Sequence, residues 1–123
     1  DYFGVELQQD QTISIEVEGL RHAFENNFFD PSITIYDAER FEVATSDDSS
    51  LLRQDGICSY QATKPGRYVI EVRESAFGGS DDCLYRLHIS DQSRPVTMVP
   101  AGGKPGEILQ ATMIDDRGNA WSE

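Results

Sequence analysis

Five aspartates could supply hard oxygen ligands near the ends of predicted strands. Asp47, Asp48 and Asp55 fall in one polar loop, and Asp30 and Asp37 lie near strand ends. Calcium takes about six to eight oxygen ligands, and loops can offer them as carboxylates, carbonyls and bound water. We predict a calcium site formed by Asp30, Asp47, Asp48 and Asp55. The alternative is a solvated acidic loop, the commoner fate of such runs, and the spacing is not that of an EF-hand.

The two cysteines, Cys58 and Cys83, both have the inward parity of their predicted strands. A disulfide between them would close a loop of about 25 residues and contribute roughly 3 kcal/mol. It would also suit an oxidising compartment. The alternative is two buried free thiols that pack as small apolar side chains. In either case we expect the two residues to lie close together in space.

Other residue types give weaker signals for chemistry. His22 and His88 are the two histidines, and the serines lack the Gly-x-Ser-x-Gly pattern of a nucleophile elbow. Gly78-Gly79 lacks the lysine of a phosphate-binding loop. We therefore predict no catalytic residue and no cofactor-binding residue. Tyr36 and Phe77 are candidate exposed aromatic side chains that could stack on a sugar or pack against a partner.

The elements that must position these residues are strands. Residues 66–73 alternate with period 2, so that Tyr68, Ile70 and Val72 share one face. Residues 85–89 alternate in the same way. Comparable short runs, separated by polar turns, are predicted over residues 3–7, 13–17, 33–36, 41–44 and 57–62. Seven or eight short strands predict an all-β, antiparallel β-sandwich, with a barrel as the competing architecture.

The composition limits the class of partner. The chain of 123 residues has 10 basic and 22 acidic side chains, a net charge of −12. This charge disfavours nucleic acid and anionic membrane surfaces. No apolar run approaches the roughly 18–20 residues of a membrane span. Because Asp1 is not an initiator methionine, we expect a mature or excised fragment from which any targeting segment has been removed.

The character of the chain changes after Ile89. We place one domain at residues 1–91 and a linker with a partial second β module at 92–123. Strands are predicted over 96–99 and 108–114, joined by a Pro/Gly-rich turn. This tail is too short to bury a core of its own. The alternative is a C-terminal strand pair that belongs to the first sandwich.

Several pieces of the sequence occur in a characteristic order. They are Asp30-Pro31 with Ile33 and Ile35, the pair Asp47-Asp48, Asp55, residues 65–72 from Pro65, and residues 85–89 from Tyr85. In order and spacing they resemble the bacterial pre-peptidase C-terminal domain over about residues 1–90, which implies a secreted or cell-surface protein. The tail from Arg94, with its Pro100–Gly106 run, resembles the opening of an immunoglobulin-like module.

The resemblance implies a jelly-roll-like sandwich, not itself catalytic, placed beside secreted peptidases. Relatives in bacterial collagenases bind collagen and calcium, but the collagen-binding residues have no match here and that activity is not carried over. We predict an accessory module, not an enzyme, that serves adhesion, spacing or substrate targeting. Its partners would be other domains of its polypeptide, an extracellular protein or a polysaccharide. The alternative function is a carbohydrate-binding module.

Overall fold

The computed structural model describes residues 1–19, 29–52 and 54–123, and these residues form strands, turns and loops without a helix. The all-β class is therefore confirmed. No helix that could cross a membrane occurs in this described part of the chain. The strands are β1 Tyr2–Leu7, β2 Thr12–Glu18, β3 Pro31–Tyr36, β4 Glu42–Ser46, β5 Ile57–Gln61, β6 Gly66–Glu74, β7 Arg86–Ser90, β8 Pro95–Val99, β9 Thr112–Asp115 and β10 Ala120–Ser122.

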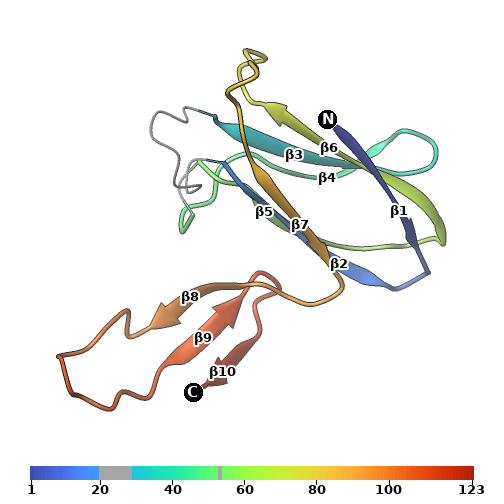
Figure 1. The fold of residues 1–123 in the computed structure, drawn as a ribbon. Coiled ribbons are helices and arrows are strands. Elements are labelled where there is room, and N and C mark those ends of the chain that lie inside the picture. The colour runs from blue at the N-terminus through green and yellow to red at the C-terminus, as the bar shows by residue number, and fades with distance from the viewer. Residues whose placement is uncertain (20–28, 53) are drawn as a thin grey trace.

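The strands form three antiparallel sheets. Sheet A has the order β1-β6-β3-β4, sheet B has the order β5-β2-β7, and sheet C has the order β10-β9-β8. Figure 1 shows sheets A and B packed face to face, with sheet C beside them. Every pairing within the sheets is antiparallel, so the predicted antiparallel sandwich is confirmed.

The core lies between sheets A and B. Along β6, Tyr68, Ile70 and Val72 are buried while the residues between them are more exposed, as the period-2 pattern predicts. Complete burial of an aliphatic side chain stabilises the fold by about 1.5–3 kcal/mol. The core cluster comprises Leu7, Ile13, Ile15, Val17, Phe29, Ile33, Ile35, Ala62, Tyr68, Ile70 and Val72.

Strand β2 departs from simple alternation. Ile13, Ile15 and Val17 face the core as predicted, but Ser14 and Glu16 on the opposite face are buried as well. The reason is that side chains from the C-terminal segment cover the outward face of sheet B, which the pattern of β2 alone does not indicate.

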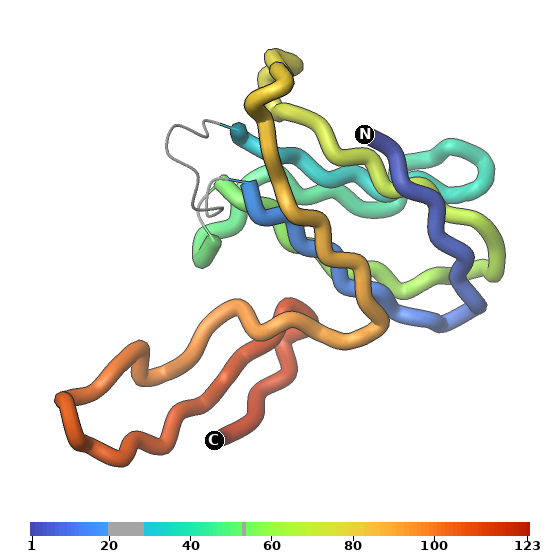
Figure 2. The backbone as a smooth tube through the Cα atoms, in the orientation of Figure 1, coloured from blue at the N-terminus to red at the C-terminus, as the bar shows by residue number. Residues whose placement is uncertain are grey.

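Sheet C differs from the predicted tail in its strand bounds. The predicted strand over 108–114 begins only at Thr112, and Ile108 is fully exposed in the preceding loop. Strand β10 is an additional strand that the sequence pattern did not indicate. Figure 2 follows the chain from the end of β7 into β8 and back through β9 and β10 beside the sandwich.

The finer prediction of a jelly roll is not confirmed. A jelly roll has about eight strands in two Greek keys. Among the described residues, sheets A and B together contain seven strands, four in one and three in the other. What the structure supports is the β-sandwich.

Candidate functional site

Asp30 lies directly before β3, and its two carboxylate oxygens have different surroundings. The Ser75 hydroxyl donates a hydrogen bond of 2.6 Å to Oδ2, and the Ser75 backbone N–H donates to the Asp30 carbonyl at 2.8 Å. The other oxygen, Oδ1, is buried and receives no hydrogen bond from the residues that the structure describes. A buried acceptor without a donor costs free energy, so this atom could accept a cation or a water molecule.

Asp47 lies in the loop after β4, and its pKa is raised above the ordinary value. Partial desolvation is the main cause, followed by the negative charges of Asp30 and Asp48. Glu74, at the end of β6, acts in the same direction, and the nearby Arg73 opposes it. Two of the other predicted calcium ligands, Asp30 and Asp48, therefore lie close enough to act on Asp47, and Glu74, which the sequence did not indicate, acts on it as well.

Asp55, the fourth predicted ligand, has a different environment. Its carboxylate is completely buried, and Oδ1 accepts a hydrogen bond of 2.9 Å from the Gly19 backbone N–H. This bond ties the loop before β5 to the end of β2. In the described part of the chain, no group of three or more histidine, cysteine or acidic side chains is arranged to hold a metal ion. The calcium site stays a prediction.

The two cysteines are free thiols, which corresponds to the second of the two alternatives. Both pack against the core. Cys58 pairs with the buried Ile15 and has the predicted inward parity, whereas Cys83 lies in the loop before β7 and has no strand parity. That the two residues lie close together stays a prediction. Burial, with a smaller contribution from the Asp116 carboxylate, raises the pKa of Cys58 to about 12. The Cys83 sulfur accepts a hydrogen bond of 3.4 Å from the Ser80 backbone N–H. The Cys58 thiol is therefore protonated and unreactive at neutral pH.

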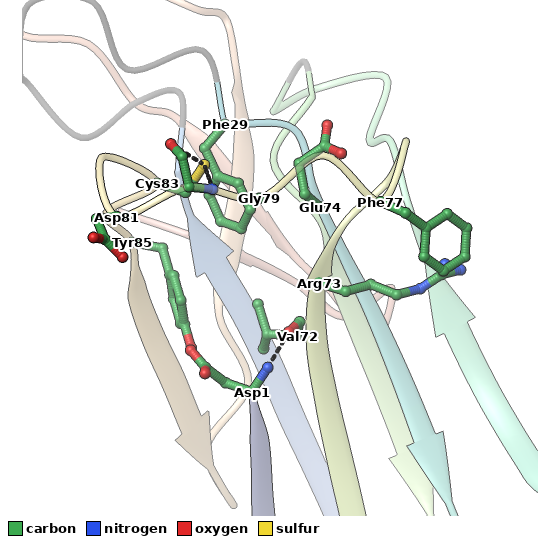
Figure 3. A pocket seen from close by; sticks show the side chains of 11 residues that line it. Asp1, Phe29, Val72, Arg73, Glu74, Phe77, Gly79, Asp81, Cys83 and Tyr85 are labelled. Carbon is green, nitrogen blue, oxygen red and sulfur yellow. Dashed lines mark hydrogen bonds between the residues drawn. The ribbon is translucent and has the colours of Figure 1, made fainter.

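A cavity of about 490 Å³ opens at one end of the sandwich, beside the loop that follows β6. Figure 3 shows Phe29 and Tyr85 on one wall and Phe77 with Arg73 on the other. The Phe29 and Tyr85 ring centroids are 5.6 Å apart, and the Arg73 guanidinium lies 4.2 Å from the Phe77 ring centroid. Phe77, a predicted exposed aromatic, is 81% exposed but has this cation as its partner.

The outward face of sheet B is covered by two arginines from the C-terminal segment. Arg94 Nε donates to a carboxylate oxygen of Glu16, whose side chain is almost completely buried. Arg117 Nε donates to the Ser14 hydroxyl at 3.0 Å, and its Nη2 donates to the Asp91 carbonyl at 2.7 Å. A buried carboxylate needs such a partner, because desolvation without one is costly.

The predicted linker is also fastened to sheet C. The Arg94 backbone N–H donates to Asp116 Oδ1 at 2.7 Å, and the Asp116 backbone N–H donates to the Arg94 carbonyl at 2.9 Å. Hydrogen bonds from Ser93 and Asn119 lower the pKa of Asp115 to about 2. Asp115 and Asp116 therefore hold the linker and the β9–β10 turn together, whereas the sequence predicted exposed linker surface.

The outward face of sheet A carries two tyrosines that share one carboxylate. The Tyr2 hydroxyl donates to Glu71 Oε1 at 3.0 Å, and the Tyr36 hydroxyl donates to Oε2 at 2.8 Å. Each hydrogen bond stabilises the protonated phenol beside the carboxylate, and it is the main reason why the pKa of each tyrosine is raised. Sequence analysis identified Tyr36 but missed Tyr2 and Glu71, which the sheet register brings beside it.

The histidines show no arrangement for nucleophilic catalysis in the described residues. His88 Nε2 lies 3.2 Å from Glu18 Oε1, and no hydrogen bond joins His88 to a serine. His88 is half-buried by this contact, although its strand parity predicted exposure. His22 falls outside the residues that the structure describes.

The comparison with known families identifies the sandwich. Residues 1–74 match the bacterial pre-peptidase C-terminal domain, which is more than half of the chain. The chain belongs to this family. Pre-peptidase C-terminal domains are C-terminal, propeptide-like accessory domains of secreted bacterial peptidases and are themselves not catalytic. No curated protein matches the chain.

The family match ends at β6, so it leaves β7 and sheet C outside. The resemblance of the tail to an immunoglobulin-like module is not confirmed. The Arg94–Glu16 and Arg117–Ser14 contacts thus join the pre-peptidase C-terminal domain to a segment that the family match does not cover. These contacts had no sequence signal, because arginines in a predicted linker or turn give no indication of the strand they will cover.

Proposed function

We propose that the chain is a non-catalytic accessory module of a secreted bacterial protein and that it serves as a rigid spacer between neighbouring domains. The observation that carries this proposal is the ion pair between Arg94 and the almost completely buried Glu16 carboxylate. A spacer that sets a fixed direction needs its two parts to be joined by more than a flexible linker, because few interdomain contacts leave relative motion as the default.

Three further contacts support the rigid arrangement. Arg117 reaches both Ser14 of sheet B and the Asp91 carbonyl, so one side chain fixes the linker to the sandwich. The backbone of Arg94 pairs with Asp116 of the β9–β10 turn. Sheet B, the linker and sheet C are therefore connected by a continuous set of hydrogen bonds.

Backbone nitrogen relaxation of the full chain tests this proposal. We expect the amides of β2 and β9 to have the same rotational correlation time. In the double variant Arg94→Ala, Arg117→Ala, the amides of β9 should have a shorter rotational correlation time than those of β2. Faster tumbling of β9 than of β2 in the unmodified chain would reject the rigid spacer. Hydrolysis of casein or a chromogenic ester by the purified chain would reject the non-catalytic role.

Calcium binding at the Asp30 end of the sandwich is a second part of the proposal. It is supported by the buried Asp30 Oδ1 and by the negative charges of Asp30 and Asp48, which act on Asp47. Calcium that binds only the folded form raises the melting temperature. We expect a higher melting midpoint in millimolar calcium than in chelator, and no such difference in Asp47→Asn. Equal midpoints for the unmodified chain would mean that this end is a solvated acidic surface.

A carbohydrate-binding module is the second candidate function. The observation in its favour is the outward face of sheet A, where Tyr2 is 70% exposed and Tyr36 lies beside it. Exposed aromatic rings on a sheet provide apolar contact area together with a polar hydroxyl group.

A further inference from the structure

The outward face of sheet A contains a shallow pocket of about 350 Å³, which we call the tyrosine pocket. It is lined by Tyr2, Tyr36, Asp37, Arg40 and Val69, which come from β1, the end of β3 with its following turn, and β6. Its volume is at the small end of the range for ligand-binding sites.

The sheet register places three of the residues around this pocket on one face. Val69 pairs with Gly4 on the edge strand β1 and with Tyr36 on β3. Side chains at these three positions point to the same outward face, because paired residues of antiparallel strands share a face. Gly4 has no side chain, and the Arg67 guanidinium occupies the space above it, so Arg67 borders the pocket on the side of β1.

The Glu71 carboxylate holds both rings in place. It accepts one hydrogen bond on each oxygen, from Tyr2 at 3.0 Å and from Tyr36 at 2.8 Å. Each carboxylate oxygen has a further lone pair that can accept from a ligand. The rings are therefore fixed before a ligand arrives, which reduces the entropy cost of binding.

The turn that follows β3 fixes the far side of the pocket. Asp37 Oδ1 accepts hydrogen bonds of 2.9 Å from the backbone N–H groups of Glu39 and Phe41. This turn holds Arg40 in a left-handed conformation with φ of 69°. Its guanidinium is the group at the pocket that can donate several hydrogen bonds.

We propose that the tyrosine pocket binds a neutral pyranose unit of a polysaccharide, which rests on the carbohydrate-binding function above. The apolar face of a sugar ring would pack on Tyr2 and Val69, and its hydroxyls would accept hydrogen bonds from Arg40. The charge of the protein favours a neutral ligand, because a net charge of −12 repels polyanions and the Asp37 carboxylate lines the pocket.

Affinity electrophoresis of the full chain through gels that contain neutral polysaccharides tests the proposal. The probes are hydroxyethylcellulose, arabinoxylan, galactomannan and laminarin, with pectin as the anionic comparison and gelatin as the polypeptide comparison. We expect at least one neutral polysaccharide to retard the chain. Tyr2→Ala and Tyr36→Ala should weaken binding about five- to tenfold through the loss of one ring contact.

Two matched variants test which part of Tyr2 contributes to binding. One distinguishes the ring from the hydroxyl, and the other tests whether any exposed aromatic side chain contributes. Tyr2→Phe keeps the ring and should retain most of the affinity. Phe77→Ala removes an aromatic side chain that is 81% exposed but lies outside the tyrosine pocket, and it should bind as the unmodified chain does. Melting curves of each variant establish that it is folded, which we expect for Tyr2 because it is highly exposed.

Four results would overturn the proposal. These are no retardation by any neutral polysaccharide, retardation by pectin alone, retardation by gelatin alone, or equal weakening in Phe77→Ala and Tyr2→Ala. None of these results bears on the rigid spacer, whose test is the relative tumbling of β2 and β9 without any saccharide. The two proposals can therefore fail independently.

Discussion

The outward faces of the two sheets of the sandwich differ in exposure: that of sheet B is covered, and that of sheet A is open. On sheet B, Ser14 and Glu16 are buried beneath Arg94 and Arg117 of the C-terminal segment. On sheet A, Tyr2 is 70% exposed at the edge of an open pocket. Both faces belong to strands with the same period-2 alternation.

This difference teaches that alternation assigns residues to faces but does not say which outward face stays open. Sheet B carries acceptors, the Glu16 carboxylate and the Ser14 hydroxyl, and arginines cover them. Sheet A also carries a carboxylate, Glu71, but tyrosine hydroxyls from its own strands donate to it. The acceptor that is satisfied within its own sheet leaves its face available for a ligand.

The largest expected effect is on the covered face. Arg94→Ala removes the cation beside the buried Glu16 carboxylate and loosens the linker from the sandwich. We expect a loss of about 2 kcal/mol in the free energy of unfolding, less than for a fully buried pair, because Glu16 is almost completely buried but Arg94 is 31% exposed. Urea unfolding of the purified chain measures it.

Arg86→Ala is the matched control for this variant. Arg86 pairs with Glu18 at 3.5 Å, also on the outward face of sheet B, but its side chain is 60% exposed. Exposed ion pairs contribute about 0–1 kcal/mol. If Arg94→Ala destabilised the chain no more than Arg86→Ala does, the claim that Arg94 stabilises the buried Glu16 carboxylate would be wrong.

Alanine substitutions at two glycines, one directly after β2 and one in β1, should have smaller effects on stability. A Cβ at Gly19 would lie 2.9 Å from a ring carbon of Phe29 and 3.1 Å from Pro31 Cγ, which are rigid core groups. At Gly4 it would meet the end of the flexible Arg67 side chain at 2.9 Å. We expect Gly19→Ala to cost about 1–3 kcal/mol through overpacking. Gly4→Ala should be neutral or slightly stabilising, because glycine weakens a strand. Thermal melts of both variants test this, and equal losses would contradict it.

A third effect, of about 0.5 kcal/mol, concerns the acidic end. The pKa of Asp47 is raised by desolvation and then by Asp30 and Asp48, so its ionised form destabilises the fold at neutral pH. Asp47→Asn should therefore stabilise the calcium-free chain at neutral pH. The gain should shrink as the pH falls through the raised pKa and vanish below the carboxyl's ordinary value of 3.8. Urea midpoints across this pH range measure it, and a gain that grows toward low pH would contradict the assigned cause.

The smallest effect is spectroscopic and concerns the open face. The hydrogen bond with Glu71 is the main reason why the pKa values of Tyr2 and Tyr36 lie above the ordinary 10.0. Glu71→Gln should let these two phenols ionise at lower pH, as followed by phenolate absorbance. Glu42→Gln should change the curve much less, because Glu42 contributes only a minor charge effect on Tyr36. Unchanged ionisation in Glu71→Gln would mean that the two tyrosines do not share this carboxylate in solution.

The sequence was sufficient for the sandwich and insufficient for its surfaces. Period-2 runs such as residues 68–72 state directly which side chains face the core, and their ordered pieces identified the family. The contacts that cover sheet B depend on the path of the chain after β7, which brings arginines of the C-terminal segment against β2. No local sequence pattern predicts that path. The Tyr2–Glu71–Tyr36 arrangement depends on the register of β1 and β3 against β6, and residues far apart in sequence gave no signal of it.

Residual dipolar couplings of the full chain test the central claim, that Arg94 and Arg117 fix sheet C in one orientation relative to sheet B. An alignment tensor is fitted to the couplings of amides in β2, β5 and β7, and a second tensor is fitted separately to those in β8 and β9. The Arg94–Glu16 and Arg117–Ser14 contacts predict that a single tensor fits both sets. Two tensors that differ in magnitude or orientation would show that sheet C moves independently, and the account of a covered face would be wrong.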